Sequence, residues 1–217
     1  MQDLRNKGEV NELSSLEVIT CNIGDLGGYQ RLELEEIVDF FKLCGVPDVL
    51  LLQEVGSQDE AEYFSDKLGL KYFVFSNDFQ RDHGMAILSG LPLLNPDKLY
   101  FKTSKYGYGA VAADLVVGGN LKVTRKKIQV VNVHMDRIDQ ITMKDKKIEV
   151  NLRSVLWFAK NEIFGDSVRS RSARELVQWL GEKGADNIIL GGDFNSVPFS
   201  KAIRIVGPGL MMRCGLL

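Results

Sequence analysis

The stretch IILGGDFNSVP at residues 188–198 decides the fold. Its first residues are apolar at consecutive positions, which is typical of a strand covered on both faces rather than of a strand with one wet face. We therefore expect IILG at 188–191, like VLLL at 49–52, to form a central strand of a sheet. Asp193 and Asn195 follow at once, so they are expected at the end of that strand, where open α/β sheets bind ligands.

Outward from this stretch, apolar runs rich in β-branched residues alternate with amphipathic segments. This alternation predicts an α/β domain in which strands are interleaved with helices. The segment 136–165 is less regular, and its part 155–164 is expected to form a helix or a lid. We expect strands over 16–23, 48–55, 71–76, 85–89, 110–117, 128–135 and 187–191, and helices over 30–43, 58–68 and from 167 onward.

The composition is that of one soluble globular domain. The chain has 217 residues, 45% of them hydrophobic, and a formal net charge of −2. That near-neutral charge disfavours a protein that binds nucleic acid without sequence preference, because such binding needs an excess of Lys and Arg. No run reaches the roughly 18 apolar residues of a transmembrane helix. Cys21, Cys44 and Cys214 have no metal-ligand spacing and are odd in number, so we expect no disulfide framework and a cytoplasmic location.

Polar or ionisable side chains follow four strongly apolar strands. Each position alone is more often a turn or a helix cap than a ligand. Four together in one domain favour a functional site, because strand ends hold such groups rigidly against a common rim. The residues are Asn22, Gln53 with Glu54, His134, and Asp193 with Asn195.

These residue types suit a hard divalent cation and a phosphate ester. Glu54 and Asp193 provide the anionic oxygen that Mg²⁺ prefers. Asn22 and Asn195 can donate hydrogen bonds to a phosphate or orient a carboxylate without adding charge. His134 can donate a proton to a phosphate oxygen as negative charge develops. Zinc is disfavoured, because no two His or Cys residues have ligand spacing.

With these motifs in view, the sequence resembles the endonuclease/exonuclease/phosphatase superfamily of DNase I-like, metal-dependent phosphoesterases. The resemblance implies a four-layer α/β sandwich with two mixed β-sheets flanked by helices and a site at one rim. It covers the chain from about residue 16 to residue 198. The matching segments, in the family's order, are VITCNI at 18–23, DVLLLQEV at 48–55, GMAILS at 84–89, VVNVHMD at 130–136 and IILGGDFNSVP at 188–198.

The resemblance also implies a role for each site residue. Glu54 is similar to the principal metal-binding carboxylate, and Asn22 to its neighbour at the metal or the scissile phosphate. His134 resembles the histidine that stabilises the phosphoryl transition state or assists the leaving group. Asp193 resembles the residue that orients or deprotonates the attacking water, and Asn195 its phosphate-contacting companion. The implied cofactor is Mg²⁺, with Mn²⁺ as an alternative.

One departure from the family pattern concerns the C-terminal part. The family continues with more strands and a closing Ser-Asp-His triplet, whereas the residues after Asn195 contain no histidine and KAIRIVGPGLMMRCGLL at 201–217 contains no Asp or Glu. We therefore expect a C-terminally truncated member with its last strands missing. The expected parts are a polar N-terminal extension at 1–15, an incomplete domain at 16–198 and a divergent tail at 199–217. His83 is a conceivable substitute for the missing histidine, but a loop role is favoured.

Two functions follow as alternatives. The first is a metal-dependent phosphodiesterase that cleaves a nucleic acid, a nucleotide or a phospholipid by in-line attack of water. The second is a catalytically inactive remnant or binding module of the same fold. The segment 137–166, which leaves the rim directly after His134, is the best candidate for a specificity element. The natural substrate and the oligomeric state stay open.

Overall fold

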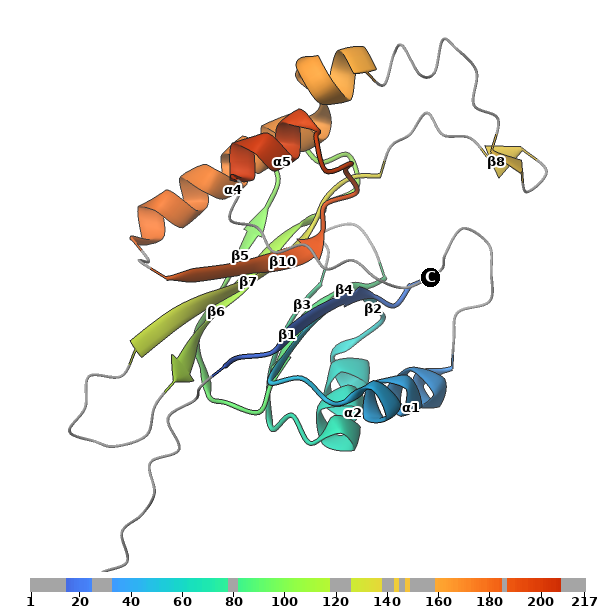
Figure 1. Cartoon of the computed structure of the whole chain (residues 1–217), viewed down its shortest axis with the longest axis vertical. Coiled ribbons are helices and arrows are strands. Elements are labelled where there is room, and N and C mark those ends of the chain that lie inside the picture. The colour runs from blue at the N-terminus through green and yellow to red at the C-terminus, as the bar shows by residue number, and fades with distance from the viewer. Residues whose placement is uncertain are drawn as a thin grey trace, which may run out of the picture.

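The computed structural model describes residues 15–24, 33–77, 82–117, 126–137, 143–144, 147–148, 159–184 and 187–207. These residues form two four-stranded β-sheets, one above the other, with helices on both outer faces (Figure 1), and a separate two-stranded sheet made of residues 143–144 and 147–148. The strands are β1 (Val18–Asn22), β2 (Val49–Val55), β3 (Tyr72–Asn77), β4 (Gly84–Ser89), β5 (Leu93–Tyr100), β6 (Gly109–Val117), β7 (Lys126–His134), β8 (Met143–Lys144), β9 (Lys147–Ile148) and β10 (Ile188–Asp193). The helices are α1 (Leu34–Cys44), α2 (Gln58–Leu68), the π-helix η1 (Ala159–Phe164), α4 (Val168–Lys183) and α5 (Lys201–Val206).

The first sheet has the strand order β1-β2-β4-β3. Strand β1 pairs in parallel with β2, and β4 pairs antiparallel with both β2 and β3. Every residue of β2 is buried, which confirms that VLLL lies in a central strand covered on both faces. Its outer face packs on α1 and α2 through residues such as Leu50, Leu52 and Phe41.

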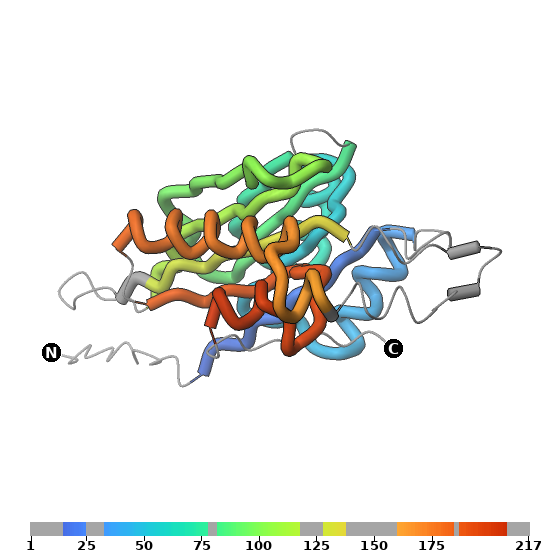
Figure 2. The backbone as a smooth tube through the Cα atoms, turned by 90° about the horizontal axis from the view of Figure 1, so that it is seen from above, coloured from blue at the N-terminus to red at the C-terminus, as the bar shows by residue number. Residues whose placement is uncertain are grey.

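The second sheet has the strand order β10-β7-β6-β5, with β10 parallel to β7 and the other neighbours antiparallel. Helices α4 and α5 cover its outer face and lie side by side there (Figure 2). Leu176 of α4 and Ala202 of α5 are fully buried in this layer, together with Val131 and Val133 of β7.

The inner faces of the two sheets pack on each other. Because side chains alternate along a strand, Val49 and Leu51 point to the second sheet while Leu50 and Leu52 point to the helices. The result is the four-layer, mixed-sheet α/β sandwich that the resemblance to the family implied. The inner layer consists of Val49, Leu51, Met85, Ile87, Val111, Ala113, Leu115 and Val130.

A polar network joins the two sheets inside this apolar layer. The side chain of Gln53 donates to Asn132 Oδ1 at 2.6 Å and to Thr20 Oγ1 at 3.1 Å. Asn132 in turn donates to the main-chain carbonyls of Leu52 and Ala86 at 2.8 and 2.9 Å. Buried amides are stable only when they are hydrogen-bonded, so the network fixes how the sheets sit relative to each other.

The helix ends follow local sequence signals. The side chain of Ser57 accepts a hydrogen bond from Glu60 N at the start of α2, and Gly69 ends that helix in the left-handed conformation with φ of 71°. Ser167 and Gly184 cap α4 in the same way. The second predicted helix therefore begins and ends where the sequence placed it, the third begins within one residue of its predicted start, and the first begins at Leu34 rather than at residue 30.

Two details of the strand prediction were wrong. IILG does not lie in a central strand, because β10 is at the edge of its sheet and is only partly buried. Its two faces are apolar because one packs on α4 and α5 and the other packs on the first sheet. Apolar faces do not show whether a second strand is hydrogen-bonded at the side of β10. The sequence reading also missed β5, an edge strand that contains Pro96 and a register shift between Leu94 and Asp97.

In the expected helix or lid over 155–164, the structure describes only residues 159–164, which form η1. Most of the segment 137–158 lies outside the described residues, as does most of the expected N-terminal extension. Within the stretch 199–217, residues 201–206 form α5 and pack on the second sheet. No described helix has the length and apolar character required to cross a membrane.

Candidate active site

The ends of β1, β2, β7 and β10 meet at one rim of the sandwich. Asn22 and His134 lie on the same faces of their strands as Val18 and Val130, which pack in the inner layer. Leu190 packs toward α4 and α5, so the alternation turns Asp193, three residues later, to the inner face. The Asn22 amide donates to Asp193 Oδ2 at 3.0 Å and approaches Glu54 Oε1 at 3.2 Å. One side chain of the first sheet thus bridges carboxylates from both sheets.

Glu54 reaches this rim through a β-bulge. Gln53 pairs with Met85 and Val55 pairs with Gly84, so Glu54 is an extra residue in the ladder, and its φ is 59°. Without the bulge, strand alternation would turn Glu54 toward α1 and α2. A non-glycine residue in the left-handed region is strained, and such strain is concentrated at functional sites.

The carboxylate of Glu54 is almost fully enclosed, with 5% of the side chain exposed. Burial opposes its ionisation, but hydrogen bonds from Arg137 and Asn22 and the positive charge of Arg137 outweigh that cost, so the pKa of Glu54 lies below its ordinary 4.5. Gly24 packs directly against it. A Cβ on Gly24 would lie 1.8 Å from Glu54 Oε2, so only glycine fits here without displacing the carboxylate.

His134 is fully buried between the two carboxylates. Its Nε2 is 3.7 Å from Glu54 Oε1 and 4.0 Å from Asp193 Oδ2. The ring packs on Tyr108, with centroids 4.1 Å apart, and Tyr108 is itself buried. The His83 ring is 6.3 Å from that of His134, so the loop before β4 brings the second histidine beside the site.

Asp193 is oriented by two donors. Asn22 holds Oδ2, and the main-chain N–H of Asn195 donates to Oδ1 at 2.8 Å. Asn195 has a φ of 46°, and its side-chain amide donates to the Met135 carbonyl at 2.8 Å. Asn195 therefore ties the loop after β10 to the loop after β7 and sets the direction of Asp193.

Arg137 is a site residue that the sequence reading missed. Its Nη2 donates to Glu54 Oε1 at 2.5 Å, and 46% of the side chain is exposed. Burial of the guanidinium would lower its pKa, but the hydrogen bond and charge of Glu54, with Tyr108 and Asp193 nearby, raise it above the ordinary value. The signal in the sequence was its place three residues after His134. The path of this loop cannot be derived from the sequence, so the contact with Glu54 could not be predicted.

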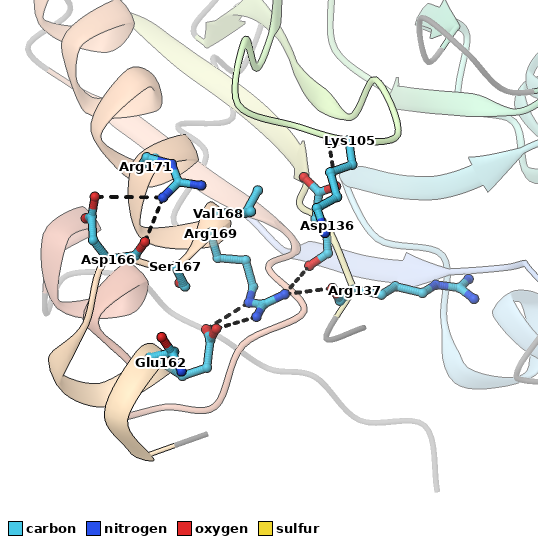
Figure 3. A pocket seen from close by; sticks show the side chains of 10 residues that line it. Lys105, Asp136, Arg137, Glu162, Asp166, Ser167, Val168, Arg169 and Arg171 are labelled. Carbon is cyan, nitrogen blue, oxygen red and sulfur yellow. Dashed lines mark hydrogen bonds and ion pairs between the residues drawn. The ribbon is translucent and has the colours of Figure 1, made fainter. Parts of the chain in front are cut away.

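A second missed residue, Arg169, anchors the loop that carries Arg137. Its guanidinium binds Glu162 with two hydrogen bonds of 2.5 and 2.9 Å and donates to the carbonyls of Asp136 and Arg137, both at 2.8 Å (Figure 3). Its neighbours Arg171 and Arg174 instead bind Asp166 on the surface. Of the three arginines in RSRSARE at 169–175, only Arg169 is therefore built into the protein interior.

A cavity of about 280 Å³ lies beside this anchor. Figure 3 shows that the side chain of Arg137 points away from Arg169, so the loop that borders the cavity projects the guanidinium to its other side. The cavity is lined by Lys105, Asp136, Arg137, Asn161, Glu162, Asp166, Ser167, Val168, Arg169 and Arg171.

The donor set fits Mg²⁺ better than a metal that needs several protein ligands. Among the described residues, no cluster of three or more His, Cys, Asp or Glu side chains has metal-binding geometry. Two carboxylates, Glu54 and Asp193, lie on either side of the Asn22 amide. Mg²⁺ is typically held by one or two carboxylates, with waters and substrate oxygens completing the octahedron.

The comparisons with known proteins concern the family and the fold. The model of the Endonuclease/Exonuclease/phosphatase family matches residues 20–210. The chain belongs to this family. A comparison with curated protein sequences found no match.

Several solved structures share the fold at low sequence identity. The chain is similar to TDP2 of D. rerio complexed with single strand DNA product, at 15% identity and a TM-score of 0.58, covering 88% of this chain and 65% of that one. It is also similar to the human Nocturnin catalytic domain with bound sulfate anion, at 18% identity and a TM-score of 0.59, covering 87% and 67%. Sphingomyelinase C from Streptomyces griseocarneus gives 20% identity and a TM-score of 0.59, covering 88% and 68%. The chain thus spans about two thirds of the length of these proteins.

Proposed function

We propose that this chain is a divalent-metal-dependent phosphodiesterase that hydrolyses its substrate by in-line attack of water. The observation that carries the proposal is the Asn22 amide between Glu54 and Asp193, with His134 Nε2 within 4.0 Å of both carboxylates. Strained backbone, buried charge and a buried imidazole are gathered at one rim, which is the pattern of a reaction centre rather than of a packing contact.

In this proposal Glu54 and Asn22 hold the metal, which is Mg²⁺ or alternatively Mn²⁺. The bound cation would act as a Lewis acid on the phosphoryl oxygens. Asp193 accepts the proton of the attacking water, and its two hydrogen bonds keep the acceptor oxygen in a fixed direction. His134 donates a hydrogen bond to the phosphoryl group as charge builds up in the transition state.

The role of Asn195 in this proposal is mainly to position Asp193. One N–H of its amide is used on Met135, which leaves the other available to a phosphate oxygen. The substrate class is a phosphodiester of a nucleic acid, a nucleotide or a phospholipid. The similar structures of TDP2 with a single strand DNA product and of a sphingomyelinase C support this range.

The test is hydrolysis of bis(4-nitrophenyl) phosphate by the purified chain with Mg²⁺ or Mn²⁺. Glu54→Gln and Asp193→Asn should each lower kcat by at least about 100-fold, because each removes a charge used in the transition state. Glu35→Gln and Asp39→Asn, exposed on α1, are the matched controls and should keep the wild-type rate.

Retention of the wild-type rate in both site variants would contradict the assignment. An inactive wild-type chain that still melts cooperatively would favour the alternative, a binding module of the same fold. If hydrolysis is observed, single-stranded DNA, a dinucleotide and sphingomyelin vesicles should then be compared to identify the substrate class.

A further inference from the structure

The Arg137–Glu54 ion pair places a cation at the atom where the proposed metal would bind. Arg137 Nη2 lies 2.5 Å from Glu54 Oε1. A Mg²⁺ ion on that same oxygen would need a distance of about 2.1 Å. Two cations this close to one oxygen repel each other strongly, since little solvent separates them at a side chain that is 5% exposed. The guanidinium and the metal therefore compete for Glu54.

The backbone and the side chain of Arg137 are held very differently. The Arg137 carbonyl accepts a hydrogen bond of 2.8 Å from the buried Arg169, which fixes the loop. In the part of the chain that the structure describes, the guanidinium is hydrogen-bonded to Glu54, and nearly half of the side chain is exposed. The flexible stem can thus swing the charged end away from Glu54 without moving the loop.

Among the residues that the structure describes, Arg137 brings a permanent positive charge to the carboxylate pair, whereas His134 is charged only when it is protonated. Glu54 and Asp193 carry two negative charges, which would repel an anionic substrate. A guanidinium released from Glu54 stays at this rim, because its backbone is anchored. Its planar fork matches two phosphate oxygens, and it cannot lose its proton.

We propose that Arg137 binds a phosphoryl oxygen of the substrate, and that its ion pair with Glu54 is the resting arrangement that a divalent cation displaces. This inference rests on the proposed function and adds to it a substrate-binding residue outside the five that the sequence indicated. It makes metal and phosphate binding cooperative, because the cation that takes Glu54 frees the group that recognises the phosphate.

The test is calorimetry of the purified chain with Mg²⁺, and then with inorganic phosphate in saturating Mg²⁺. Arg137→Gln should bind Mg²⁺ about tenfold more tightly than wild type, because the competing charge is gone, and bind phosphate about tenfold more weakly. Arg137→Lys keeps a charge but loses the fork, so its Mg²⁺ affinity should stay near wild type and its phosphate affinity should fall. Arg171→Gln, on the surface pair with Asp166, is the control and should change neither.

A purely structural Arg137 would not raise the Mg²⁺ affinity when it is replaced. If Arg137 only holds Glu54 in place, Arg137→Gln should bind Mg²⁺ less tightly than wild type or equally tightly, and either result overturns the inference. The proposed function survives that result as long as Mg²⁺ binding still depends on Glu54. If wild type binds no Mg²⁺, or if Glu54→Gln binds it as tightly as wild type, the proposed function fails together with the inference. Thermal melts of each variant verify that it is folded.

Discussion

The buried pair of Arg169 and Glu162 gives a sharp prediction about stability. The two side chains are 5% and 1% exposed, and Arg169 makes four hydrogen bonds, two of them to main-chain carbonyls of the loop that carries Arg137. Arg169→Met would leave the Glu162 carboxylate buried without its counter-charge. Breaking a buried pair in this way costs about 3–5 kcal/mol.

That loss is large for a domain of this kind, whose whole free energy of unfolding is about 5–15 kcal/mol. Urea unfolding followed by circular dichroism should show a clear fall in the midpoint for Arg169→Met. Arg171→Met is the matched control, since Arg171 is 41% exposed and its partner Asp166 is on the surface, and it should unfold with the wild type.

A double variant separates charge from packing. Glu162→Met combined with Arg169→Met removes both charges at similar volume, and it should recover most of the loss, because no uncompensated charge stays buried. An Arg169→Met variant that unfolds within 1 kcal/mol of wild type, or a double variant less stable than the single one, would refute the reasoning.

Three further predictions concern the rim and the inter-sheet network. Gly24→Ala should weaken Mg²⁺ binding at least about tenfold in calorimetry, because the added Cβ displaces the Glu54 carboxylate. Gly90→Ala is the control and should keep the wild-type affinity, because a Cβ there meets nothing within 4 Å. Equal affinities of the two variants would refute the packing argument. The pKa of Glu54 in the folded protein lies below its ordinary 4.5, so ionised Glu54 stabilises the fold above that pH. In EDTA, the excess in free energy of unfolding of wild type over Glu54→Gln should therefore shrink as the pH falls below 4.5. A constant excess down to pH 3 would contradict this. Asn132→Leu should lower the free energy of unfolding by about 2–4 kcal/mol in urea, because Gln53 and two carbonyls lose buried hydrogen-bond partners, and a loss below 1 kcal/mol would show that the network is dispensable.

The sequence by itself determined the layers of this fold. Runs such as VLLL at 49–52 are apolar on both faces, and that property requires cover on both sides whatever the topology. Helix starts and ends at Ser57, Gly69, Ser167 and Gly184 were equally local, since a cap depends on neighbouring residues alone. The order of motifs then indicated the family, which the match over residues 20–210 confirmed.

Only the tertiary structure decided how the site residues are aimed. Glu54 faces the rim because a bulge breaks the alternation of β2, and the register of β2 against β4 is a property of two strands rather than of one sequence window. Arg137 and Arg169 were missed for a related reason. Their partners, Glu54 and Glu162, are reached through loop paths and helix packing, and long-range contacts leave no periodic signal along the chain.

The stretch IILGGDFN shows both sides of this division. Its sequence placed Asp193 and Asn195 correctly at the end of a strand, because that depends on local alternation and a following turn. Its sequence placed β10 wrongly at the centre of a sheet, because apolar faces describe what packs above and below a strand, whereas sheet order depends on hydrogen bonds at its sides.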